Sequence, residues 1–131
     1  MTERLTLSDL RRHLESQQDR RRVRGTKRKT VDGITFDSTR EANRYAELKL
    51  LEKTGDIASL ELQPLFELHG KNGPIMTDSG QQQRVYHADF RYIDWRLNGV
   101  WVVEDVKGFA TDKYKLVRAI LAAQGVDIVE V

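Results

Sequence analysis

A stretch of strand-forming residues at 85–108, VYHADFRYIDWRLNGVWVVEDVKG, constrains the fold of this 131-residue chain most strongly. Two such runs flank Asn98-Gly99, a pair typical of tight turns between antiparallel strands. The first run contains one acid, Asp89, and the second ends in an acid-x-Lys triplet that begins at Asp105 and ends at Lys107. Alternate side chains of a strand point to the same face, so Asp105 and Lys107 are expected to lie together. The stretch therefore predicts a β-hairpin with charged groups gathered at one end.

The length of the hairpin connection decides which acid shares a face with Asp89. A two-residue turn at Asn98-Gly99 would place Asp89 on the face of Glu104, because a one-residue slip exchanges the two faces of a strand. A three-residue connection at 97–99 would instead place Asp89 with Asp105, and it would use Gly99 in a left-handed conformation.

The three-residue connection pairs Asp89 with Lys107 and Arg91 with Asp105. We therefore predict that the connection is odd-numbered, or that a bulge restores the same parity. In either case the side chains at 89, 105 and 107 share a face, and Glu104 points to the opposite one.

The rest of the chain predicts two helices and two further strands. Ser38 and Gly55 are the cap residues of the first helix, and Thr111 is the N-cap of the second. The order is then helix, three strands, helix, strand, and the last crossover should bring the final strand parallel to the strand of Asp105. A mixed α/β sheet with a helix on each face follows, from these segments: helix 39–54, strand 57–69 interrupted by Pro64, loop 70–83, hairpin 85–108, helix 111–124 and strand 127–131.

Five segments together resemble a small phage-encoded family of the PD-(D/E)XK nuclease superfamily, which is similar to the junction resolvases. They are GITFDSTREANRYAELKLLEKTG, IASLELQP, YHADFRYID, VVEDVKG and TDKYKLVRAILAAQG. Asp89 followed by Asp105-Val106-Lys107 matches the Asp…(Asp/Glu)-x-Lys core, although Ala88 stands where the superfamily name has proline. The resemblance implies an αβββαβ, restriction-endonuclease-like core.

The same resemblance implies a metal-dependent endonuclease that hydrolyses DNA phosphodiesters, in one version only at particular DNA structures. Asp89, Asp105, the carbonyl of Val106 and Glu41 would hold Mg²⁺ or Mn²⁺, which prefer hard oxygen ligands. The metal would acidify a bound water and balance charge in the transition state. Lys107 would orient or activate that water, or hold the phosphate.

Structural interpretations of the same residues stand beside the catalytic ones. Glu41 completes a capping box with Ser38, which by itself explains its presence. Asp89 and Lys107 would form a surface salt bridge that contributes about 0–1 kcal/mol. Trp95 and Trp101 are expected to be packing residues rather than platforms for stacking bases.

Positive charge is concentrated at the N-terminus. Residues 1–30 have a net charge of +6, and residues 31–131 have a net charge of −4. We therefore expect a basic arm at 1–30, with a helix in it as one option, followed by a nuclease-like domain at 31–131. The arm either binds DNA phosphates or is a solvated tail; the residues that would make the contacts are Arg20, Arg21, Arg22, Arg24, Lys27, Arg28 and Lys29.

Composition excludes several other classes of protein. Cysteine is absent, so no disulfide framework or thiolate zinc site is expected. No apolar run approaches the ~18 residues of a membrane span, so we expect a cytoplasmic protein, in a bacterial host cell if it is phage-encoded, without a membrane partner. DNA is the expected partner, and a second copy of the chain is a further option. The alternative functions are a non-catalytic DNA-binding protein with the nuclease-like fold, or a phage interaction protein.

Overall fold

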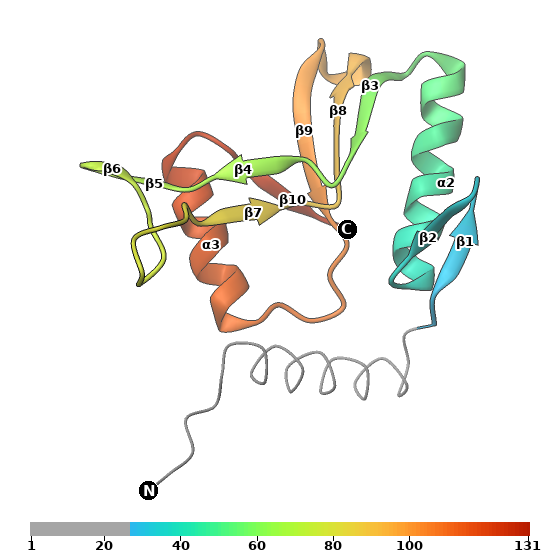
Figure 1. Ribbon diagram of the computed structural model, residues 1–131. Coiled ribbons are helices and arrows are strands. Elements are labelled where there is room, and N and C mark those ends of the chain that lie inside the picture. The colour runs from blue at the N-terminus through green and yellow to red at the C-terminus, as the bar shows by residue number, and fades with distance from the viewer. Residues whose placement is uncertain (1–26) are drawn as a thin grey trace, which may run out of the picture. The chain divides into compact units, whose positions relative to one another are not determined.

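Four strands form the main sheet of this computed structural model, which describes residues 27–131 (Figure 1). Their order is β10 (Ile128–Glu130), β9 (Val100–Asp105), β8 (Phe90–Asp94) and β3 (Ile57–Leu62). Strand β8 is antiparallel to both β3 and β9, whereas β10 is parallel to β9. Helix α3 (Asp112–Ala123) makes the crossover between these two parallel strands. The predicted mixed α/β sheet and its parallel last strand are therefore confirmed.

The chain divides into two compact units, residues 1–43 and 44–131, and the division falls within helix α2 (Thr39–Thr54). In the first unit, β1 (Lys29–Val31) pairs antiparallel with β2 (Ile34–Phe36). The domain boundary expected after residue 30 thus lies inside β1. The second unit contains the main sheet, α3 and the C-terminal part of α2.

Both helices begin and end where the sequence predicts. The amide of Glu41 donates to Ser38 Oγ at 3.1 Å, and the amide of Tyr114 donates to Thr111 Oγ1 at 3.1 Å. Gly55 ends α2 with a φ of 85°. Such a left-handed position after a helix strongly favours glycine, because other residues carry a Cβ that clashes there.

A β-ribbon, residues 65–87, replaces the expected long strand and loop between β3 and the hairpin. Strand β4 (Leu65–Glu67) pairs with β7 (Val85–His87), and β5 (His69–Gly70) pairs with β6 (Gly73–Pro74). The predicted interruption at Pro64 is confirmed, because β3 and β4 lie on either side of it. The part after Pro64 belongs to a separate sheet, however, and the prediction of a plain loop over 70–83 was wrong. Strand β3 ends before Pro64, which has no amide hydrogen to continue the ladder.

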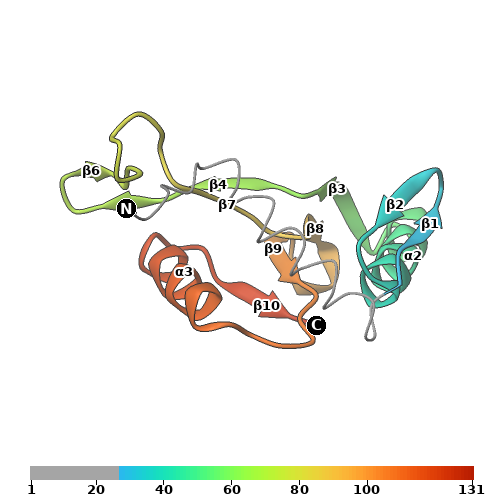
Figure 2. The same cartoon turned by 60° about the horizontal axis from the view of Figure 1, so that its bottom comes forward.

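The β-ribbon extends beyond the main sheet on the side of α3 (Figure 2). Gln124, at the end of α3, joins the two elements through its side-chain amide. Its Oε1 accepts from the amide of His69 at 2.8 Å, and its Nε2 donates to the carbonyl of Glu67 at 2.9 Å.

The hairpin connection between β8 and β9 contains five residues, Trp95–Gly99. It is odd-numbered, as predicted, but the three-residue version was wrong, because Arg91 pairs with Val103 rather than with Asp105. Asp94 begins a short 3₁₀ turn, η1 (Trp95–Leu97), by accepting from the amide of Arg96 at 2.9 Å. A Cβ on Gly99 would lie 2.6 Å from Cζ3 of Trp95, so this ring requires glycine there.

Large apolar side chains fill the space against the main sheet. The most deeply buried are Phe90 of β8, Ile57 of β3, Leu48 of α2 and Leu121 of α3. Neither of the helices described over residues 27–131 is long and apolar enough to cross a membrane.

Candidate active site

Asp89 and Asp105 are neighbours at the end of the β8–β9 hairpin. Phe90, the first residue of β8, pairs with Glu104, so Asp89 comes just before the paired residues of β8 and Asp105 is the last residue of β9. The amide of Asp89 donates to Asp105 Oδ1 at 3.0 Å and to the carbonyl of Glu104 at 3.1 Å. The amide of Val106 donates to Asp89 Oδ2 at 2.7 Å. The Asp105 carboxylate is thus bonded to the backbone of Asp89, and the Asp89 carboxylate to the backbone next to Asp105, which keeps the two acids close together.

Asp105 is 1% exposed, and the hydroxyl of Tyr86 on β7 donates to its Oδ2. Burial raises the pKa of the Asp105 carboxyl, and the neighbouring Asp89 acts in the same direction. The Tyr86 hydroxyl and the ammonium of Lys107 oppose this rise in pKa. A cation bound beside Asp105 would favour the ionised form further.

Lys107 comes two residues after Asp105, and the ring of Tyr114 on α3 positions its ammonium. Its Nζ lies 4.5 Å from the centroid of that ring, which in turn lies 6.1 Å from the centroid of the Tyr86 ring. Burial raises the pKa of Tyr114 to about 12, and burial also raises the pKa of Tyr86. Both phenols therefore stay protonated at neutral pH, and Tyr86 remains a hydrogen-bond donor to Asp105.

Glu104 points to the opposite face of β9, as predicted, and is also 1% exposed. Arg44 of α2 holds it with two bonds of 2.7 Å, from Nε to Oε1 and from Nη2 to Oε2. The hydroxyl of Tyr92 donates to Glu104 Oε2. This Arg44–Glu104–Tyr92 cluster links β9, the strand of Asp105, to α2 on the face of the sheet to which Glu104 points.

Glu41 and the carbonyl of Val106 are the other two predicted metal ligands. Glu41 belongs to the first compact unit, and its place relative to Asp89 and Asp105 stays a prediction. The carbonyl of Val106 as a metal ligand also stays a prediction, since the observed contact is made by its amide.

Of the predicted DNA-binding arm, Arg20, Arg21, Arg22 and Arg24 lie outside the described residues. Lys29 begins β1, and its Nζ donates to Asn43 Oδ1 at 3.0 Å. Its ammonium is thus already hydrogen-bonded within the first unit.

The carboxylates of Asp89 and Asp105 offer oxygen donors of the kind that the predicted metal requires. Within residues 27–131, no group of three His, Cys, Asp or Glu side chains is placed to hold a metal ion. Mg²⁺, however, commonly takes one or two carboxylates and completes its octahedron with water and substrate phosphate. Two neighbouring carboxylates, one of them buried, fit this requirement of Mg²⁺ or Mn²⁺.

The family model described as "Protein of unknown function (DUF1064)" matches residues 21–130. The chain belongs to the DUF1064 family. The matched range of this DUF1064 chain includes the whole hairpin, with Asp89, Asp105 and Lys107. Neither a curated protein nor a solved structure shows significant similarity to it.

Three residues that contact the acids or Lys107 were not predicted from the sequence: Tyr86, Tyr114 and Arg44. Tyr86 lies on β7, Tyr114 on α3 and Arg44 on α2, so none of them shares the hairpin whose alternation placed the acids. A weak signal existed for Tyr114, which occupies the first turn of the helix that follows Lys107.

Proposed function

We propose that this protein is a metal-dependent endonuclease that hydrolyses DNA phosphodiesters. The observation that carries the proposal is the direct contact of Asp89 with the Asp105 carboxylate at the end of one hairpin, with Lys107 two residues beyond Asp105. The strand order β3-β8-β9-β10 and the α3 crossover support a restriction-endonuclease-like αβββαβ core. In this proposal Asp89 and Asp105 hold Mg²⁺ or Mn²⁺, and Lys107 faces the same site.

The residues of the chain would have separate roles in cleavage. A bound divalent cation supplies charge neutralisation and a more acidic water. Tyr86 and the amide of Asp89 hold the Asp105 carboxylate in one orientation, so that its oxygens need not reorganise during the reaction. Lys107 binds a phosphate oxygen or orients the attacking water, and the Tyr114 ring limits where its ammonium can move.

The direct test is incubation of the protein with supercoiled, linear, single-stranded and branched DNA in Mg²⁺, Mn²⁺ or EDTA. We expect cleavage that requires the cation. Asp105→Asn and Lys107→Ala should each lower the rate by about 10²–10⁴-fold, the usual contribution of a positioned catalytic group.

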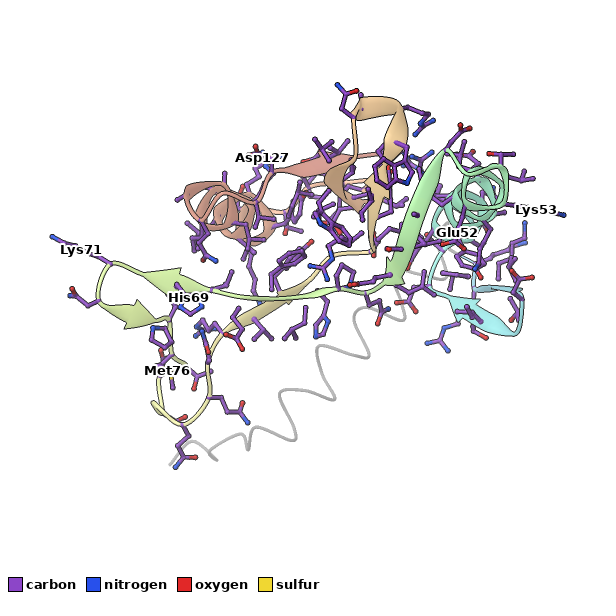
Figure 3. The ribbon with its side chains drawn as sticks, turned by 90° about the horizontal axis from the view of Figure 1, so that it is seen from above. Glu52, Lys53, His69, Lys71, Met76 and Asp127 are labelled. Carbon is purple, nitrogen blue, oxygen red and sulfur yellow. The ribbon has the colours of Figure 1, made fainter. Side chains whose placement is uncertain are left out.

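A matched control for Lys107→Ala is Lys71→Ala. Lys71 projects from the tip of the β-ribbon (Figure 3), where it is exposed, and its loss should leave the rate unchanged. Full cleavage by folded Asp105→Asn protein would contradict the proposed site. DNA binding without cleavage in any metal would favour the non-catalytic alternative.

A further inference from the structure

A pocket of about 300 Å³ lies on the face of the sheet that carries Asp89 and Asp105. Phe66 of β4, Arg91 of β8, Trp101 and Val103 of β9, and the turn at 125–127 line it. Figure 3 shows Asp127 of that turn on the connection between α3 and β10. The volume is at the lower end of the range for ligand pockets and suits a single small ring system.

The pairing register gives the position of this pocket relative to the two carboxylates. Trp101, Val103 and Asp105 are alternate residues of β9, so they point to the same face. Arg91 of β8 is opposite Val103. The pocket therefore begins one two-residue step, about 7 Å, along the strands from the proposed catalytic pair.

Aromatic rings and a guanidinium form the walls. Trp101 is 53% exposed, so about half of its surface is open to solvent. The guanidinium carbon of Arg91 lies 5.0 Å from the Trp101 ring centroid and 5.8 Å from that of Phe66. These are distances at which a cation and an aromatic ring attract each other, so they keep the Arg91 side chain between the two rings and Glu61.

The charge of Arg91 already has a partner. Its Nε and Nη2 donate to Glu61 Oε2 at 3.1 and 2.5 Å. A phosphate placed here would have to compete with that carboxylate and would be repelled by it. The pocket thus suits an uncharged planar ring, which gains from stacking and needs no ion pair.

We propose that this pocket stacks an unpaired nucleobase of the DNA strand whose phosphate lies at Asp89, Asp105 and Lys107. The inference rests on the proposed function and deepens it, because it names the substrate class. A base inside a duplex is stacked between two neighbours and paired with a base of the other strand. It would have to leave the helix to reach Trp101. Single-stranded DNA, or a branched DNA with an unpaired nucleotide, presents such a base without that cost.

The test is a binding experiment in EDTA, so it does not depend on cleavage. The chain contains two tryptophans, Trp95 and Trp101, and Trp95 is 58% exposed. Trp95→Phe leaves Trp101 as the fluorescent reporter, and Trp101→Phe leaves Trp95 as a matched control. We expect oligodeoxythymidylate to quench Trp101 saturably, with little effect on Trp95, and a blunt duplex to quench neither.

Affinity gives a second readout. Trp101→Ala should bind oligodeoxythymidylate about 5- to 150-fold more weakly, as expected for the loss of one base–aromatic stack, and should bind duplex as before. Trp101→Phe should retain most of the affinity, because it keeps an aromatic face. Thermal melting of each variant shows that it is folded.

Equal quenching of both tryptophans, or unchanged single-strand affinity in folded Trp101→Ala, would overturn the base pocket. Quenching confined to Trp101 in a protein that cleaves no DNA would support the pocket and count against the nuclease. Metal-dependent cleavage, with no quenching of Trp101 by single-stranded DNA, would support the nuclease and count against the pocket. The two proposals can therefore fail separately.

Discussion

Asp105 is a buried carboxylate that accepts hydrogen bonds from the Tyr86 hydroxyl and the Asp89 amide. Burial raises its pKa above the value of about 3.9 that an aspartate has in an unfolded chain. Between those two pKa values the folded protein binds more protons than the unfolded chain. The free energy of unfolding therefore falls as pH rises through that interval, and at neutral pH the ionised Asp105 lowers stability.

Asp105→Asn should raise the melting temperature at neutral pH in EDTA by about 2–6 °C, because it removes a buried charge and keeps an acceptor for the Asp89 amide. It should also remove the fall in stability just above pH 4. Circular dichroism melts across pH measure both effects. Asp78→Asn, an exposed acid of the β-ribbon, is the control and should change neither. A lower melting temperature for Asp105→Asn would show that the carboxylate is a stabilising ion-pair partner instead.

At the scale of single elements, the sequence predicted what depends on near neighbours. Ser38 and Thr111 cap their helices through amides three residues away, so their signals lie within one turn. The five-residue length of the connection was not predicted. Asn98-Gly99 is the obvious turn signal in the sequence, whereas the connection begins earlier, at the 3₁₀ turn that Asp94 caps. The Asp94 carboxylate accepts from the Arg96 amide and starts η1 before the expected turn.

The candidate site was predictable to the same extent. Alternation along β9 separates Asp105 from Glu104, and an odd-numbered connection brings Asp89 to the face of Asp105. The partners of these acids come from other elements. Arg44 reaches Glu104 across 60 positions of sequence, and local patterns contain no information about that contact.

Arg44→Met tests how strongly this contact supports β9. The substitution leaves the Glu104 carboxylate buried without its guanidinium, and removing one partner of a buried pair costs about 3–5 kcal/mol. Denaturant unfolding should show that loss as a lower midpoint with an unchanged slope. Lys49→Met, which removes the more exposed pair with Glu52 on the same helix, should cost less than about 1 kcal/mol. Equal losses for both variants would contradict a specific role for Arg44.

At the scale of the whole molecule, Arg20, Arg21, Arg22 and Arg24 precede the described residues in the sequence. Deleting residues 1–26 removes four of these arginines and keeps β1, which begins at Lys29. We expect weaker DNA binding with a less steep dependence on salt, and each lost phosphate contact should lower the log–log slope on duplex by about 0.9. A full-length variant with glutamine at Arg20, Arg21, Arg22 and Arg24 should behave alike. Unchanged affinity and slope would show that the arm is a solvated tail.

The adjacent acids of β9 also matter while the chain is folding. A hairpin that forms one residue out of register still presents a carboxylate to each face of the sheet, because Glu104 and Asp105 simply exchange places. The distribution of charge over the two faces therefore destabilises the shifted hairpin only slightly relative to the native one. The bidentate contact with Arg44 and the Tyr92 hydroxyl distinguish the two states, since an aspartate is one methylene shorter than the glutamate they hold. The Arg44–Glu104–Tyr92 cluster thus favours the native register of the hairpin over the shifted one.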